Sequence, residues 1–117
     1  MSQPIVIVDA ENVRRSRWPN LTAAALVERS RAWATAEGNR LLVVFDGPPP
    51  EDGDDLVGTR GESADDRITA VAGELAAEGT PYWLVTSDRE LRRRAGGAAA
   101  RVIGGGSFLA VLPSAGA

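Results

Sequence analysis

Short runs of β-branched and other apolar residues alternate along this chain with longer segments of helical periodicity. Continuous apolar runs are typical of strands that are buried on both faces of a parallel sheet. Because parallel neighbours need a crossover connection, usually a helix, the alternation predicts an α/β fold with right-handed crossovers. The runs lie at residues 4–8, 41–45, 82–86 and 101–103, with a shorter candidate at 56–57.

Two of the intervening segments have the spacing of amphipathic helices. Residues 21–37 place apolar side chains on one face, and Gly38 follows as a stop signal. From Ile68, apolar residues recur at i, i+3, i+4, i+7 and i+8, and Gly79 ends the pattern. We therefore expect a small three-layer domain with a mainly parallel sheet flanked by helices. Shorter helices are expected at residues 88–95 and 107–112, the latter with Ser107 as its cap.

The length and composition fit a single domain of residues 1–117. Hydrophobic residues make up 44% of the chain and charged residues 25%, which is ordinary for a soluble globular protein. The first residues lack the pattern of a signal peptide, and no apolar run approaches membrane-spanning length, so we expect a cytoplasmic protein without membrane contact. The net charge of −3 argues against strong nonspecific nucleic-acid binding but allows a local basic patch.

The chain contains no His and no Cys, and all 13 of its basic residues are Arg. Without His or Cys there is no Ser-His-Asp triad, no Cys-His pair and no His-rich zinc site. The absence of Lys excludes the P-loop signature and Schiff-base chemistry. Any catalysis must therefore use carboxylates, amides, hydroxyls, Arg, Tyr or a bound metal ion.

Three of the predicted strands are followed by an acid, namely Asp9, Asp46 and Asp88. Ligands of open parallel sheets bind outside the carboxyl ends of the strands, so these three side chains could share one crevice. Asp is also common in turns and at helix starts, which explains any one of them without a function. Three together, each after an apolar run, favour a shared site.

A fourth acid, Asp65, opens the helix that contains Ile68. Ser63 and Asp66 have capping-box spacing, which gives Asp66 a structural role. At about 100° per residue, Asp65 leans toward the buried face while Asp66 points away. Stabilisation of the helix N-terminus by negative charge explains Asp65, taken alone, equally well.

Converging carboxylates repel one another, and their pKa values rise unless a cation neutralises them. Oxygen ligands select Mg²⁺ or Mn²⁺ over zinc, and Mg²⁺ in proteins commonly engages substrate phosphates. An acidic pocket without His therefore predicts a divalent metal site made by Asp9, Asp46, Asp65 and Asp88. Such a site activates a water for in-line attack on a phosphodiester.

Four short motifs, in this order and in this strand and helix context, resemble the NYN domain family of PIN-like nucleases. The resemblance is to the bacterial branch, in which a helix starts with Glu-Thr/Ser-Ala-Asp, and it runs from residue 5 to about residue 112. The motifs are DAEN at residues 9–12, FD at 45–46, ESADD at 62–66 and VTSD at 85–88.

The resemblance implies a metal-dependent endoribonuclease with a PIN-like fold that uses Mg²⁺ or Mn²⁺ to hydrolyse RNA. Asp9, Asp65 and Asp88 would supply the core acids, with Asp46 as a further ligand and Glu62 as an additional acid. The chain is shorter than many bacterial relatives, and the loop after the second strand does not align residue by residue. The resemblance therefore leaves the choice of RNA open.

Arg side chains, which match phosphate geometry, follow two of the acids. They are Arg14, Arg15 and Arg17 after the first acid and Arg89 after the last. Trp18 lies beside the first group as a surface on which a base can stack. Three more Arg at residues 92–94 suit the last turn of a helix, where cations interact favourably with the helix dipole.

Asn12 and Ser87 are the other candidate substrate contacts. In the family pattern Asn12 orients the first Asp or contacts substrate, although a loop Asn also supports turns. Ser87, like Thr86, matches a small hydroxyl residue beside the last acid. Ser87 and Glu90 also have capping-box spacing, which favours a structural role for both.

Two other functions remain open. The same fold could bind RNA or a protein without turnover, and the short, acidic chain is compatible with that. The same acids could instead serve a metal-dependent phosphatase or nucleotide hydrolase. RNA is the expected partner, while association with a larger RNA–protein assembly and the oligomeric state are left open.

Overall fold

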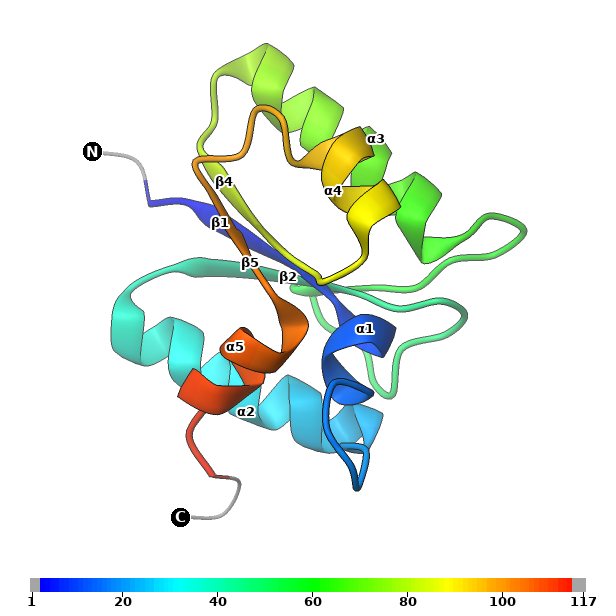
Figure 1. Ribbon diagram of the computed structural model, residues 1–117, viewed down its shortest axis with the longest axis vertical. Helices are drawn as coiled ribbons and strands as arrows, with labels where there is room; N and C mark the ends of the chain where they lie inside the picture. The colour runs from blue at the N-terminus through cyan, green and yellow to red at the C-terminus, as the bar shows by residue number, and fades with distance from the viewer. Residues whose placement is uncertain (1–2, 115–117) are drawn as a thin grey trace.

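Five strands form one sheet in the computed structural model, which describes residues 3–114 (Figure 1). Their spatial order is β3-β2-β1-β4-β5, and every neighbouring pair is parallel. The predicted parallel α/β sheet is therefore confirmed. The strands are β1 (Ile5–Asp9), β2 (Arg40–Val44), β3 (Leu56–Val57), β4 (Tyr82–Val85) and β5 (Arg101–Ile103).

Helices cover both faces of this sheet, which completes the predicted three layers (Figure 1). The first, second and fifth helices pack on one face, and the third and fourth pack on the other. Within residues 3–114, no helix is long and apolar enough to cross a lipid bilayer. The helices are α1 (Ala10–Arg14), α2 (Ala23–Glu37), α3 (Ala64–Glu78), α4 (Arg89–Ala95) and α5 (Gly105–Val111).

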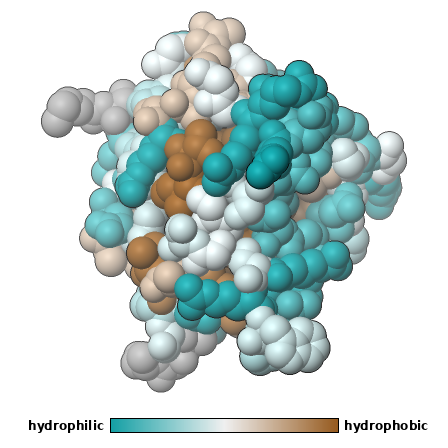
Figure 2. All heavy atoms as spheres, in the orientation of Figure 1, coloured by the Kyte–Doolittle hydropathy of each residue, from teal (hydrophilic) through white to brown (hydrophobic). Residues whose placement is uncertain are grey.

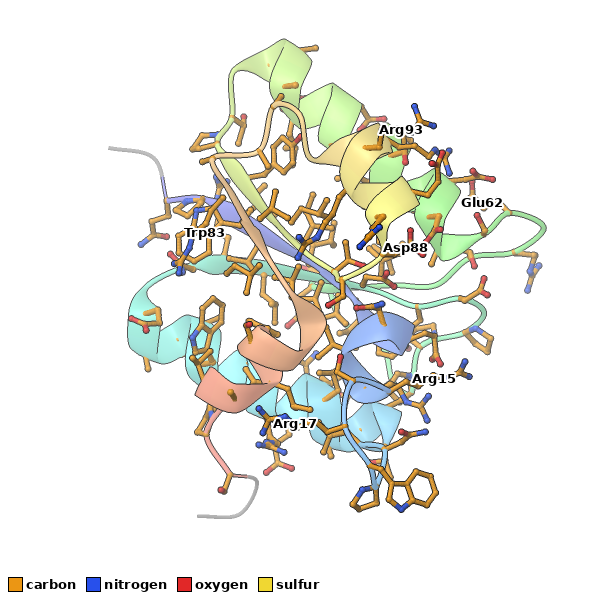
Figure 3. All side chains as sticks on the ribbon, viewed as in Figure 1. Arg15, Arg17, Glu62, Trp83, Asp88 and Arg93 are labelled. Carbon is orange, nitrogen blue, oxygen red and sulfur yellow. The ribbon has the colours of Figure 1, made fainter. Side chains whose placement is uncertain are left out.

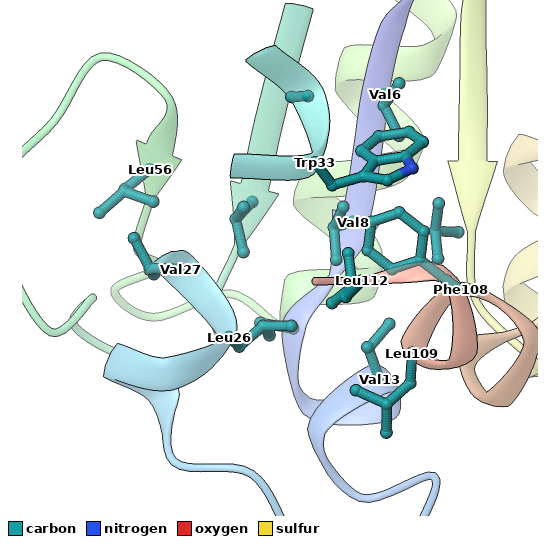
Figure 4. Close-up of a cluster of buried hydrophobic side chains, with 14 of the residues drawn as sticks. Val6, Val8, Val13, Leu26, Val27, Trp33, Leu56, Phe108, Leu109 and Leu112 are labelled. Atoms are coloured by element: carbon teal, nitrogen blue, oxygen red, sulfur yellow. The ribbon is translucent and has the colours of Figure 1, made fainter. Parts of the chain in front are cut away.

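The central strand β1 contributes to two cores because successive side chains of a strand point to opposite faces. Val6 and Val8 pack in the cluster under α1, α2 and α5, whereas Ile7 packs in the cluster under α3 and α4. In the first cluster, Trp33 meets Phe108 edge to face, with ring centroids 4.9 Å apart (Figure 4). The strand that ends in Asp9 is thus held rigidly from both sides.

The strand order places a topological switch point beside Asp9. After β1 the chain builds β2 and β3 on one side, and it then crosses over to build β4 and β5 on the other. Val8 pairs with Val85, so β1 and β4 end side by side. Connections leave these two strand ends toward opposite faces, which opens the crevice where sheets of this kind bind ligands.

The two long helices begin and end close to the predicted positions. Thr22 caps α2 and Ser63 caps α3, each by accepting a hydrogen bond from a backbone N–H three residues ahead. Gly38 and Gly79 close these helices with φ of 69° and 73°, a left-handed conformation that glycine adopts without steric cost.

Two short helices differ from the prediction. Helix α1 was not expected at all, because its five residues are too few to show an apolar period. Helix α5 begins at Gly105 with Gly104 at the cap position, so the prediction that Ser107 caps it is wrong. The early start lets the backbone of Gly105 approach α1 closely: a Cβ atom there would lie 2.5 Å from Ser16 Oγ and 2.6 Å from Asn12 Oδ1.

Candidate functional site

A cavity of about 620 Å³ opens at the carboxyl edge of the sheet, between the ends of β1 and β4. Its walls come from α1, the start of α3, the loop after β4 and the start of α5. Three of the four predicted acids line it, together with one acid that was not predicted. The lining residues are Asp9, Glu11, Asn12, Arg15, Ser16, Asp65, Ser87, Asp88 and Gly106.

Asp9 is the most deeply placed of the acids. It is the last residue of β1, and only 5% of its surface is exposed. Burial raises its pKa from the usual 3.8 to about 6, because a charged carboxylate loses solvation there. The Thr86 hydroxyl, which donates to Asp9 Oδ2 at 2.9 Å, opposes this rise, whereas the charges of Asp65 and Asp88 add to it.

Asp65 reaches the cavity from the first turn of α3. Its pKa is raised, first by burial and then by the nearby charge of Asp88. The next residue, Asp66, is exposed and accepts a hydrogen bond from Arg94 Nη2 at 2.8 Å. The sequence prediction that these neighbours face different ways, with Asp65 inward, is confirmed.

Asp88 lies at the mouth of the cavity, below α4 and facing α1 (Figure 3). Its Oδ1 accepts a hydrogen bond from Leu91 N at 2.8 Å and thereby caps α4. Its own N–H donates to Thr86 Oγ1 at 3.2 Å. The prediction of a Ser87 cap with Asp88 in the first helical position is therefore wrong by one residue.

Ser87 and Asn12 belong to a network that joins three elements at the cavity wall. Asn12 Oδ1 accepts from Ser87 N at 2.8 Å, and Ser87 Oγ accepts from Gly105 N at 2.8 Å. These contacts tie α1, the loop after β4 and the start of α5 together. Both predicted residues therefore line the cavity while also holding its wall in place.

Asp46 and Glu62 do not line the cavity. Asp46 is exposed beyond β2, where its Oδ1 lies 3.5 Å from the Thr59 hydroxyl, and it is a minor contributor to the raised pKa of Asp65. Glu62 accepts a hydrogen bond from Arg67 Nε at 2.8 Å and lies outside the start of α3 (Figure 3). The structure thus brings together Asp9, Asp65 and Asp88 and leaves these two acids apart.

Of the predicted arginines, Arg15 reaches the cavity. Arg14 is half-buried and binds Glu11 Oε2 at 2.8 Å, while Arg15 Nη2 lies 3.2 Å from the same oxygen (Figure 3 labels Arg15). Arg89 is exposed at the start of α4 and does not line the cavity. Each Arg at residues 92–94 is engaged within the fold: Arg92 with Thr86 O, Arg93 with Glu90 and Arg94 with Asp66.

Glu11, Ser16 and Gly106 line the cavity without a role predicted from the sequence. Glu11 adds a carboxylate to the wall, but it is bound by the neighbouring Arg14 and Arg15. Thr86 does not line the cavity, but it is fully buried beside it and connects Asp9 to the backbone of Asp88. The sequence signal for Thr86 was its position directly after an apolar strand. That position places it at the carboxyl edge of the sheet, where Asp9 also lies.

The donor set of the cavity suits a hard divalent cation. All three clustered acids offer carboxylate oxygens, and burial without a neutralising Arg leaves Asp9 with a raised pKa, which a bound cation would lower. Within residues 3–114, however, no three His, Cys, Asp or Glu side chains lie close enough together to form a complete metal site. Binding by all three acids therefore needs a rearrangement of side chains such as those of Asp65 and Asp88.

Comparison with known proteins supports the fold. No protein-family model matches the sequence, and no curated protein matches it significantly. A crystal structure of a point variant of Rae1 (YacP) from Bacillus subtilis matches with a TM-score of 0.74 and 26% identity, over 92% of this chain and 74% of that chain. A second crystal structure of Rae1 (YacP) from the same organism gives a TM-score of 0.70 and 23% identity, over 92% and 72% of the two chains. The chain therefore has the fold of these structures.

Proposed function

We propose that this chain is a metal-dependent endoribonuclease of the NYN type, with Asp9, Asp65 and Asp88 as its catalytic acids. The observation that carries the proposal is the cavity at the switch point of the sheet, which these three acids line and in which Asp9 is buried without a neutralising partner. The likeness to Rae1 (YacP) supports an RNA-related function.

The three acids would hold Mg²⁺ or Mn²⁺, and the bound cation would supply an activated water and charge neutralisation at a phosphodiester. Asp9 provides a fixed anchor because Thr86 and the two flanking cores prevent it from turning away. Asp65 and Asp88 approach from two different elements. Asp46 is exposed beyond the end of β2 and does not line the cavity, and we propose only a secondary role for it in metal binding.

Arg15 is the cation best placed to meet a substrate phosphate at this cavity. It lines the wall and is itself exposed, so it can exchange its Glu11 contact for a phosphate. Asn12 and Ser87 hold another part of the wall in place, where polar groups can meet the sugar–phosphate backbone. Figure 2 shows hydrophilic residues gathered over the side that carries α1 and the starts of α3 and α4.

A binding module without turnover is the second candidate. The observation that favours it is that the described acids do not form a complete metal site as they stand. In that case the cavity would bind RNA, and the cation would stabilise the complex without supporting hydrolysis.

The two candidates are separated by a cleavage assay on structured and single-stranded RNA with Mg²⁺, with Mn²⁺, and with EDTA. The nuclease proposal predicts internal cleavage that EDTA abolishes and that Asp9→Asn reduces by at least about a hundredfold, as expected when a group that holds catalytic charge is lost. Asp66→Asn, which alters an acid outside the cavity, is the matched control and should keep its activity.

Cleavage that persists in Asp9→Asn would overturn the proposal. RNA binding without cleavage under every metal condition would support the binding module. Release of phosphate from nucleotides, with no cleavage of RNA, would instead identify a phosphatase or nucleotide hydrolase that uses the same acids.

A further inference from the structure

Trp18 is the most exposed large hydrophobic residue among residues 3–114, with 89% of its surface accessible. The other large hydrophobics that are exposed in this part of the chain are Val102 and Val111, at 37% and 59%. An exposed Trp costs more free energy in water than a buried one, because it presents a large apolar ring. At the tip of a loop, this ring would gain free energy from being covered by a binding partner.

The loop that carries Trp18 is held firmly at its base. Leu21 N donates to Arg14 O at 3.0 Å and closes the loop. Ser16 N donates to Val13 O at 3.1 Å, and Ser16 Oγ donates to Asn12 O at 2.7 Å. At the tip, residues 17–20 are all exposed. The ring is therefore presented on an anchored loop rather than on a chain terminus.

The loop that carries the ring also carries two arginines, one of which lines the cavity. Arg17 precedes Trp18, is exposed, and has no ion pair with any residue of the described part of the chain. Arg15, at the base of the loop, lines the cavity (Figure 3 labels both arginines). Arg17 thus precedes the exposed ring in the chain, and Arg15 connects the base of its loop to the cavity.

We propose that Trp18 stacks on a base of single-stranded RNA, a few nucleotides from the phosphodiester held in the acidic cavity. This inference rests on the proposed function and names its substrate class. Cations at the base and tip of the loop suit a polyanionic strand, and an accessible aromatic face accepts any unpaired base. Bases in a duplex are stacked on each other and offer no free face, so the loop selects single strands.

The geometry makes the contact dependent on RNA length. Arg15 is six positions after Asp9 in the chain, which corresponds to about 9 Å at the helical rise per residue. Trp18 lies beyond that, at the loop tip. A dinucleotide in the cavity does not extend over α1 and the loop, whereas a strand of ten nucleotides does.

Binding is measured with the Asp9→Asn protein, so that no RNA is cleaved, using a ten-uridine RNA and the dinucleotide UpU as probes. The Asp9→Asn protein, which is the background for all variants here, should bind the decamer more tightly than UpU. Adding Trp18→Ala should weaken decamer binding by about tenfold. Trp18→Phe keeps an aromatic face and should restore most of this loss. Val111→Ala, which removes another exposed hydrophobic side chain far along the chain, should bind like the background protein.

Fluorescence gives a direct readout, because the other two Trp residues of the chain, Trp33 and Trp83, are buried and half-buried. The decamer should quench the solvent-exposed emission, and this quenching should disappear in Trp18→Phe. Equal decamer affinity in the background protein and in Trp18→Ala would overturn the inference even where wild-type protein cleaves RNA. Trp18-dependent decamer binding in a protein that never cleaves RNA would support the inference and overturn the nuclease proposal.

Discussion

The side chain of Thr86 joins two of the three clustered acids: its hydroxyl donates to Asp9 Oδ2 at 2.9 Å and accepts the Asp88 N–H at 3.2 Å. A hydroxyl can do both at once because it has one donor and two acceptor positions. Thr86 is fully buried, so water cannot replace it. This one side chain therefore orients the carboxylate of Asp9 and fixes the backbone position of Asp88.

Thr86→Val should impair the site more than Thr86→Ser. Valine keeps the shape of the side chain but removes the hydrogen bond that lowers the pKa of Asp9, whereas serine keeps the hydroxyl. A hydrogen bond to a charged group contributes about 1.5–3 kcal/mol, so we expect a loss of RNA cleavage of about tenfold or more in Thr86→Val. The pH at which activity appears should also move upward. Equal rates and pH profiles for the two variants would contradict this role of Thr86.

Asp9→Asn should stabilise the metal-free protein at neutral pH. The pKa of Asp9 is raised by burial from 3.8 to about 6, so between these values the folded state binds more protons than the unfolded state. The stability that Asp9 provides is therefore greatest below about pH 4 and is lost as the pH rises through 6. The difference corresponds to about 3 kcal/mol.

This prediction is checked by denaturant unfolding in EDTA from pH 4 to pH 8. Asp9→Asn should be more stable than wild type at pH 8, and its advantage should shrink toward pH 4. An advantage that does not change with pH would show that burial of the Asp9 charge is not its cause.

Asp65→Asn and Asp66→Asn form a matched pair on the first turn of α3. Asp65 faces the cavity, while Asp66 is exposed and binds Arg94. We expect Asp65→Asn to lose both RNA cleavage and the thermal stabilisation that Mn²⁺ gives to the wild-type protein. Asp66→Asn should keep both, with a small change in stability from the lost surface ion pair. Similar losses in the two variants would contradict a specific role for Asp65, the acid that faces the cavity.

Gly105→Ala should disturb the cavity wall, whereas Gly106→Ala should not. A Cβ at residue 105 would lie 2.5 Å from Ser16 Oγ and 2.6 Å from Asn12 Oδ1, but the nearest atom at residue 106 is 4.0 Å away. Overpacking of this kind costs about 1–3 kcal/mol, while Ala in place of a helical Gly without a clash is neutral or stabilising. Thermal unfolding of both variants measures the difference. A stable, fully active Gly105→Ala would show that the close approach of α5 to α1 is dispensable.

The sheet and the inward acids could be predicted because they follow simple periods. Apolar runs marked the strands, and the acid after β1 must lie at the carboxyl edge once the strands are parallel. The 3.6-residue period separated Asp65 from Asp66. In each case the position of the acid follows from the burial of its apolar neighbours. The spacing of apolar residues in the sequence shows which neighbours are buried.

The features that were missed depend on contacts between distant segments. Ser87 and Asp88 are both good cap residues. Asp88 caps α4 because the Ser87 hydroxyl already accepts a hydrogen bond from Gly105 N. The position of Asp46 depends on the long loop after β2, which is held by contacts such as that between Arg31 and Asp55 (2.7 Å). No local pattern encodes such a pairing.

The central claim is that Asp9, Asp65 and Asp88 together bind a divalent cation. The most direct test is an anomalous difference map from crystals of the protein grown with Mn²⁺ and a non-cleavable RNA. We expect a peak within coordination distance of Asp9 and of at least one of the other two acids, and no such peak in Asp9→Asn crystals. Carboxylates that stay apart in wild-type crystals, with no peak between them at saturating Mn²⁺, would contradict it.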